Sequence, residues 1–178
     1  MLTLYGCYRS RATRPLWALF ETGMAFTHHP TIQAYRLPDP AAADAPANTA
    51  SPDFLKVNPM GQIPAMVDGD LVLTESLAIT LHIVRRAGGP IAPANDAETA
   101  LMEQWALFAS TAIEGPALDI AMTITKGQDK TLEDVLRPDL FYRLGAMTII
   151  CPPLRAGVRR SIDRSAVCNS QTSPGRIW

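Results

Sequence analysis

Apolar residues near the start of the chain form two patterns, which predict a strand followed by a helix. Leu2–Tyr5 is a short apolar run of the kind found in buried strands. Between Arg11 and Thr22 the apolar residues recur at helical spacing, and Gly23 is expected to cap the helix. The expected apolar side of this helix consists of Leu16, Trp17, Leu19 and Phe20. A second short strand is predicted over residues 25–28.

The next segment predicts a loop, a short helix and a hairpin. Residues 38–52 are rich in Ala, Pro, Asp and Asn without periodicity, which indicates an irregular loop before a short helix over 53–57. Pro64 interrupts the apolar run 60–66 and must lie at a strand start, an edge or a turn, because proline cannot donate to a sheet ladder. Asp68-Gly69-Asp70 is a strong hairpin signal and leads into a strand over 71–73.

A helix is predicted from about Glu75 to Arg86, ending at Gly88-Gly89. Thr74 is the expected N-cap, which puts Glu75 and Ser76 in the first turn. The resulting order is β-α-β-(α)-β-β-α, and it defines a predicted first domain over 1–88. Residues 89–97 are rich in Gly, Pro and Ala and are expected to form a linker.

A helical second domain is predicted over 97–178. One helix is predicted from four apolar residues at helical spacing: Leu101, Trp105, Phe108 and Ala112. Another helix is expected over 116–125. The regular spacing of apolar residues fades after about residue 137. Residues 137–178 contain seven arginines and two acidic residues, whereas residues 1–136 carry a net negative charge. We expect this tail to be atypical, and a shifted reading frame or a truncation would explain its composition.

Composition narrows the possible classes of protein. The chain has 178 residues, 47% hydrophobic and 19% charged, which suits a soluble globular protein of one large or two small domains. A net charge of −1 gives no reason to expect nucleic acid or an anionic membrane as partner. There is no apolar run of transmembrane length and no signal-peptide layout. An odd, sparse set of cysteines (Cys7, Cys151 and Cys168) favours a reducing, cytoplasmic location.

The Ile63–Ser76 segment combines features suited to a peptide ligand. A cis bond between Ile63 and Pro64 would turn the Ile63 backbone outward, free to pair with an extended peptide. A helix N-terminus beside the small hydroxyl of Ser76 would suit an α-carboxylate, and Glu75 would oppose the ammonium of the same ligand. The alternative is a plain hairpin followed by a capped helix.

The ordered run Asn-Pro-x-Gly-x-Ile-Pro (58–64), Asp-Gly (68–69) and Glu-Ser-x-Ala-Ile (75–79) resembles the glutathione-binding half of the glutathione S-transferases. The resemblance covers residues 1 to about 125. It implies an α/β thioredoxin-like N-terminal domain followed by an all-α C-terminal domain, in a bacterial-type detoxification enzyme that pairs as a homodimer. It further implies that Ile63, with Gln62 and cis-Pro64, holds the cysteinyl part of glutathione, and that Glu75 and Ser76 hold the γ-glutamyl end.

A glutathione transferase must convert a thiol into a thiolate. Lowering a thiol pKa by about two units takes about 2.7 kcal/mol, and a hydrogen bond to a charged group contributes about 1.5–3 kcal/mol. One well-aimed hydroxyl is therefore of the right size, especially with a helix N-terminus nearby. Ser10, where the first strand meets the first helix, resembles the catalytic serine of serine-type transferases. An ordinary helix cap at Ser10, or Tyr8 as the donor, remain alternatives.

Cys7 opens a further alternative, because Cys-x-x-Ser at a strand-to-helix junction resembles monothiol glutaredoxins and cysteine-type transferases. The chain could then be a glutathione-dependent thiol reductase, or Cys7 could simply end a strand; a glutathione-binding protein without turnover is a third possibility. Arg9, Arg11 and Arg14 could favour an anionic ligand or form a solvated helix face.

The transferase resemblance implies an electrophilic, mostly apolar small molecule as acceptor, with glutathione as co-substrate. No metal or bound cofactor is expected, since His28-His29 stands without a second group of ligands.

Overall fold

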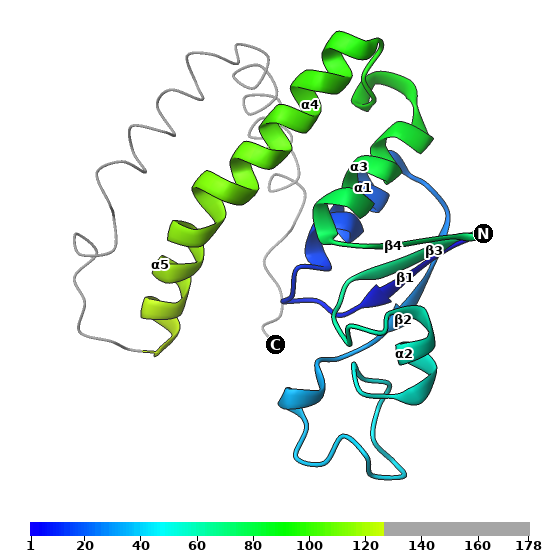
Figure 1. Cartoon of the computed structure of the whole chain (residues 1–178), viewed down its shortest axis with the longest axis vertical. Helices are drawn as coiled ribbons and strands as arrows, with labels where there is room; N and C mark the ends of the chain where they lie inside the picture. The colour runs from blue at the N-terminus through cyan, green and yellow to red at the C-terminus, as the bar shows by residue number, and fades with distance from the viewer. Residues whose placement is uncertain (127–178) are drawn as a thin grey trace, which may run out of the picture. The chain divides into compact units, whose positions relative to one another are not determined.

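The structure is a computed structural model that describes residues 1–126 (Figure 1). The chain divides into two compact units, Met1–Ala106 and a second unit that begins at Leu107. Everything predicted for residues 127–178, including the atypical tail and Cys151 and Cys168, lies outside the described residues.

The first unit contains a four-stranded mixed sheet. Its strands are β1 (Leu2–Gly6), β2 (Phe26–Pro30), β3 (Ala65–Asp68) and β4 (Leu71–Thr74), in the order β2-β1-β3-β4. β1 pairs in parallel with β2, so the two strands need a crossover, which α1 (Thr13–Thr22) provides. The β1–β3 and β3–β4 pairs are antiparallel, with Gly69 in the left-handed region at the hairpin turn. The predicted thioredoxin-like arrangement of the first domain is confirmed.

Helices cover both faces of this sheet (Figure 1). α1 and α3 (Ser76–Ala87) pack together on one face, while the short α2 (Pro52–Val57) lies on the other. Alternation along β1 explains the two layers: Leu2 and Leu4 are buried in the core, while Tyr5 contacts Phe54 of α2 with ring centroids 6.0 Å apart. The core beneath α1 and α3 is built mainly from Leu2, Leu4, Leu16, Leu19, Met66, Ile79 and Ile83.

The predicted apolar side of α1 is half wrong. Leu16 and Leu19 are buried, but Trp17 and Phe20 are 65% and 62% exposed. Successive residues of a helix point about 100° apart. When Leu16 and Leu19 face the core, the residues that follow them, Trp17 and Phe20, therefore point toward solvent. Trp17 Nε1 instead donates to Glu21, and Phe20 packs edge-on against Phe26.

The segment between β2 and α2 is irregular, as predicted, and is organised by a buried amide. It contains a 3₁₀ turn, η1 (Ala34–Arg36), and the fully buried Asn48. Asn48 Nδ2 donates to the carbonyls of Pro40 and Pro46, and its Oδ1 accepts from the Ala50 N–H. These bonds satisfy backbone groups that no sheet or helix would satisfy.

The far half of α3 is tied to the β3–β4 hairpin by charge. Asp68 Oδ2 accepts from His82 Nε2 at 3.0 Å and also pairs with Arg86. The hydrogen bond from His82, and after it the one from Arg86, lower the pKa of Asp68 below its ordinary value. The Asp68 carboxylate is therefore a charged link between sheet and helix.

Beyond a second 3₁₀ turn, η2 (Gly89–Ile91), the chain is helical to the end of the described residues. α4 (Asp96–Phe108), a π-helical segment (Ala109–Ile113) and α5 (Glu114–Lys126) follow one another without a loop. Both predicted helices are present. The division between units falls within α4, and the predicted boundaries of 1–88 and 97–178 stay a prediction.

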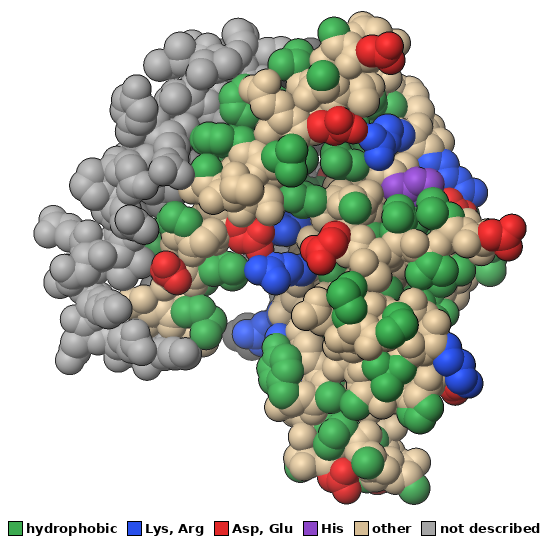
Figure 2. Space-filling view, viewed as in Figure 1, with side chains coloured by type: hydrophobic (Ala, Val, Ile, Leu, Met, Phe, Trp, Pro, Cys, Tyr) green, Lys and Arg blue, Asp and Glu red, His purple; other side chains and the backbone are tan. Residues whose placement is uncertain are grey.

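The surface of the described residues shows no dominant apolar region on the visible face. Figure 2 shows its hydrophobic side chains in several separate groups among polar ones. No described helix combines the length and apolar character needed to cross a membrane.

Candidate functional site

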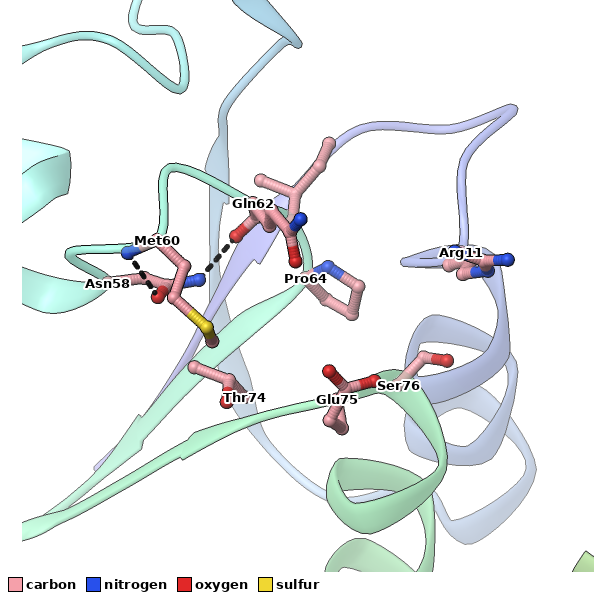
Figure 3. A pocket seen from close by; sticks show the side chains of 9 residues that line it. Arg11, Asn58, Met60, Gln62, Pro64, Thr74, Glu75 and Ser76 are labelled. Atoms are coloured by element: carbon pink, nitrogen blue, oxygen red, sulfur yellow. Dashed lines mark hydrogen bonds between the residues drawn. The ribbon is translucent and has the colours of Figure 1, made fainter. Parts of the chain in front are cut away.

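A small cleft opens in the first unit where the turn that precedes β3, residues 58–64, faces the start of α3 (Figure 3). Its volume is about 70 Å³, and it is lined by Arg11, Asn58, Met60, Gln62, Ile63, Pro64, Thr74, Glu75 and Ser76. All five residues predicted to bind glutathione line it: Gln62, Ile63, Pro64, Glu75 and Ser76. Pockets that enclose a drug-sized ligand are about 300–1,000 Å³, so this cleft suits one end of a ligand.

One wall of the cleft is the turn that ends in the cis bond between Ile63 and Pro64. Asn58, almost fully buried, holds this turn: its Nδ2 donates to the Gln62 carbonyl at 2.7 Å and its Oδ1 accepts from the Met60 N–H at 3.1 Å (Figure 3). The Ile63 backbone makes no hydrogen bond to any described residue. Its N–H and C=O therefore have no hydrogen-bond partner among residues 1–126, and their pairing with an extended ligand stays a prediction.

Asn58 is an organising residue that sequence reasoning did not assign. This role could have been predicted from the Asn58-Pro59 pair. Asn before Pro favours a turn in which the side-chain oxygen accepts a hydrogen bond from the backbone N–H two residues further on. The Met60 N–H bond to Asn58 Oδ1 is this arrangement. Met60 and Thr74 also line the cleft without having been predicted to.

The opposite wall is the start of α3. Thr74 was expected to cap this helix, and that expectation is wrong: Thr74 ends β4, and Glu75 occupies the N-cap position with a φ of 66°. Thr74 pairs with Ala65 in the sheet and is held extended, so the turn into the helix falls on Glu75 alone. Glu75 is exposed, whereas Ser76 is only 4% exposed.

Two arginines reach this region, one just before α1 and one in its first turn. Arg11 lines the cleft, and Arg14 NH1 donates to Ser76 Oγ at 3.0 Å. Of the two interpretations left open by the sequence, an anion-binding role and a solvated helix face, the first is consistent with these positions. Glu75 is the acidic residue of the lining.

Ser10, the predicted catalytic residue, is not among the cleft-lining residues. Its Oγ donates to the Cys7 carbonyl at 2.6 Å and accepts from the Ala12 N–H at 3.1 Å. The N-cap position of α1 is Ala12, so Ser10 bonds the turn before the helix and does not cap the helix itself. The Ser10 hydroxyl proton is directed at its own loop.

Cys7 and Tyr8, the alternative residues at this junction, also lie outside the cleft lining. Cys7 is half-buried and its Sγ lies 3.5 Å from Gln33 Oε1. Tyr8 is 59% exposed and its ring meets the His28 ring edge-on. Within residues 1–126 there is no group of three or more His, Cys, Asp or Glu side chains arranged to hold a metal ion.

The junction nonetheless packs directly beside the turn that forms the first wall. Gly6 has a φ of +155°, and a Cβ placed on it would lie 2.5 Å from the Ala12 Cβ and 3.8 Å from the Ile63 Cβ. Only glycine allows this approach of β1, the α1 loop and the Ile63 turn. The loop that carries Ser10 is thereby placed next to the cleft.

Comparison with known proteins agrees with this geometry. Residues 1–85 match the family model described as glutathione S-transferase, N-terminal domain. Residues 1–85 are thus similar to the N-terminal domain of that family. The Zea mays protein "Glutathione S-transferase 3" is 51% identical over 57 residues, which cover 30% of this chain and 25% of that protein. The Schizosaccharomyces pombe protein "Glutathione S-transferase 3" is 28% identical over 132 residues, 70% of this chain and 50% of that protein.

A solved structure shows the same fold over more of the chain. The theta-class glutathione S-transferase of Xanthomonas axonopodis pv. citri, solved with glutathione bound, superposes with a TM-score of 0.55 at 24% identity. The match covers 89% of this chain and 70% of that one. The chain thus has the two-domain transferase architecture, while it spans only a quarter to a half of the two curated relatives above.

Proposed function

We propose that this chain binds glutathione in the cleft between the Ile63–Pro64 turn and the start of α3. The observation that supports this most directly is the meeting of five residues, chosen from the sequence, in one cleft of a glutathione S-transferase N-terminal domain. Ile63 pairs its unbonded backbone groups with the cysteinyl part of glutathione. Gln62 and Pro64 flank that contact.

The γ-glutamyl end occupies the cleft itself, whose volume of about 70 Å³ suits a single amino-acid end. Its ammonium faces the exposed carboxylate of Glu75. Its α-carboxylate accepts hydrogen bonds from the Ser76 hydroxyl and the free N–H groups of the first turn of α3. Arg11, on the rim of the same cleft, contributes a favourable positive charge.

The activity that follows is that of a glutathione S-transferase with Ser10 as the catalytic residue. The thiol of glutathione loses its proton to solvent, and the Ser10 O–H donates to the resulting thiolate. The sulfur then forms a bond to carbon in an electrophilic, mostly apolar small molecule, and the leaving group departs with the bonding electron pair. Ser10 must first turn its O–H away from the Cys7 carbonyl. No metal or bound cofactor takes part, and glutathione is the co-substrate.

A second candidate is a protein that binds glutathione without turnover. The position of Ser10 favours it, because the Ser10 hydroxyl is bonded within its own loop and lies outside the cleft lining. The third hypothesis, a thiol reductase, would use Cys7, whose Sγ lies 3.5 Å from Gln33 Oε1.

A thermal melt of the full chain with and without millimolar glutathione tests the binding proposal. A ligand that binds only the folded state stabilises it, by about 2.7 kcal/mol at a hundredfold excess over Kd. We expect the cooperative transition to move to higher temperature with glutathione and to stay in place with Gly-Gly-Gly. A transition that ignores glutathione would contradict the roles of Ile63, Glu75 and Ser76.

Conjugation of an activated aryl chloride then separates the three activities. If Ser10→Ala removes conjugation and Cys7→Ser keeps it, the transferase proposal stands. The reverse result, together with reduction of a glutathione mixed disulfide, identifies a thiol reductase. Binding without conjugation of any electrophile in a broad panel identifies the binding protein.

The proposal also includes a homodimer with a detoxifying role in the cytoplasm. Light scattering coupled to size exclusion is expected to give twice the chain mass of 19.3 kDa. A single-chain mass at micromolar concentration would remove the dimer from the proposal. Fractionation of cells that make the tagged chain tests the location.

A further inference from the structure

Arg14 and Ser76 meet at the cleft although they are 62 positions apart in the sequence. Arg14 lies in the first turn of α1, and Ser76 is the first residue of α3. Arg14 NH1 donates to Ser76 Oγ at 3.0 Å. Because Ser76 is only 4% exposed, its hydroxyl has little contact with bulk water, and the surrounding protein groups determine its hydrogen bonds.

The donor and acceptor capacities of the two groups set the direction of the remaining hydrogen bond. A serine hydroxyl has one proton to donate and two lone pairs, whereas a guanidinium only donates. Arg14 therefore occupies a lone pair of Ser76 Oγ and leaves its proton unused. Among residues 1–126, Ser76 Oγ donates to no acceptor, and Thr80 Oγ1 bonds the Ser76 carbonyl instead. The Ser76 O–H is thus available to an acceptor in the cleft.

A carboxylate is the natural acceptor for this arrangement, since it only accepts when ionised. Arg14 also places its positively charged guanidinium in direct contact with the Ser76 hydroxyl, with NH1 3.0 Å from Oγ. Hydrogen bonds that involve charged groups are stronger than neutral ones. The loss of Arg14 should therefore weaken ligands that carry the carboxylate more than ligands that lack it.

We infer that Arg14 is a positioning residue of the proposed glutathione site. Through the Ser76 hydroxyl it presents a donor to the α-carboxylate of the γ-glutamyl end, and it makes the cleft select ligands with that carboxylate. The inference rests on the proposed function, because it assigns a role within the same cleft. It adds a selectivity device that joins α1 to α3.

Titration calorimetry with two ligands tests this role. The ligands are glutathione and the analogue 4-aminobutanoyl-Cys-Gly, which lacks only the α-carboxylate of the γ-glutamyl part. We expect wild type to prefer glutathione by about tenfold or more, and Arg14→Met to raise the Kd for glutathione by about tenfold. The Kd for the analogue is expected to change by less than about twofold. Loss of packing alone would weaken both ligands in parallel.

Further variants separate orientation from charge. Arg14→Lys keeps the charge and is expected to recover part of the preference for glutathione, while the neutral Arg14→Gln recovers less. The double variant Arg14→Met/Ser76→Ala is expected to bind no more weakly than Ser76→Ala alone, because both changes remove the same hydrogen bond. Arg85→Gln is the matched control: it removes one arginine that pairs with Glu103, away from the cleft lining.

The results also distinguish failure of the inference from failure of the proposed function. If wild type does not bind glutathione, the proposed function fails and the inference fails with it. If wild type binds but Arg14→Met keeps the full preference, or its effect adds to that of Ser76→Ala, only the inference is overturned. Should Arg14→Met not melt cooperatively, Arg14→Gln is measured in its place, and an unchanged preference would overturn the inference equally.

Discussion

Two neighbouring regions of the first domain differ in how they use their hydrogen-bonding groups. In the segment 58–76, Asn58 satisfies the turn, and no other residue of 1–126 bonds the Ile63 backbone at the cleft. In the β1–α1 junction, the Ser10 hydroxyl satisfies its own loop through Cys7 and Ala12. The first region is already arranged to receive a ligand, whereas the second must exchange a hydrogen bond before it can act on one.

Under the proposed function, this difference separates ligand binding from catalysis within the first domain. A preformed binding surface loses little entropy when ligand arrives. The Ser10 hydroxyl already donates to the Cys7 carbonyl. It donates to a ligand only once a stronger acceptor, such as a thiolate, replaces that carbonyl. The following predictions test whether the two regions really act in these separate ways.

The largest expected effect is on stability, at the point where the two regions touch. Gly6→Ala places a methyl group 2.5 Å from the Ala12 Cβ at a φ of +155°, so we expect a loss of about 2–5 kcal/mol in the free energy of unfolding. Gly69→Ala is the control, because it shares a positive φ but meets nothing within 4 Å. Its expected cost is about 1–2 kcal/mol. Equal losses in urea unfolding would show that the close approach does not matter.

The second effect concerns chemistry alone. Ser10→Ala is expected to lower kcat/KM for conjugation by about 100-fold, the equivalent of two pKa units on the thiol. The Kd for glutathione should stay within about threefold, because Ser10 does not line the cleft. Steady-state kinetics and calorimetry on the same preparation measure both. If affinity fell as far as rate, the two regions would not be separable.

The third effect concerns binding alone. Glu75→Gln removes the counter-charge for the ligand ammonium and should raise the Kd for glutathione by about tenfold. At saturating glutathione, kcat should be unchanged. Asp70→Asn is the matched control, since it removes an exposed acid outside the cleft lining. A similar loss in both variants would point to general electrostatics and away from Glu75.

The smallest effect is a pH dependence of stability at the anchored end of α3. Because His82 and Arg86 hold the pKa of Asp68 below its ordinary value, Asp68 stabilises the fold above the unfolded-state pKa of about 3.9. This stabilisation is lost as pH falls through the lower folded-state pKa. Urea unfolding at pH 6 and pH 3 should show the difference between wild type and Asp68→Asn shrinking at the lower pH. A difference that is the same at both pH values would remove Asp68 from this role.

Much of the first domain could be predicted from local patterns. The strands followed from short apolar runs, and the hairpin followed from Asp68-Gly69, whose glycine takes the positive φ of the turn. The cis bond between Ile63 and Pro64 followed from the proline, because X-Pro bonds are the ones that adopt cis at low cost. These features depend on neighbours in the chain, so the residues themselves carried the information.

The errors arose where a distant element decided the outcome. Thr74 looked like a helix cap, but its pairing with Ala65 keeps it in β4 and moves the cap to Glu75. Trp17 and Phe20 fit an apolar helix side, yet the sheet meets α1 along Leu16 and Leu19. In each case the local propensity was satisfied and the packing partner chose between equally acceptable positions.

The sequence by itself determined the strand and helix order, the Ile63–Pro64 turn and the identity of five of the nine residues that line the cleft. Tertiary structure alone decided that Arg14 bonds Ser76, that Asn58 holds the turn and that the Ser10 hydroxyl faces the Cys7 carbonyl. The physical reason is the reach of each interaction. Propensity and turn chemistry act over a few residues of chain, whereas the direction of a hydroxyl proton is set by whichever donor or acceptor the folded chain brings beside it.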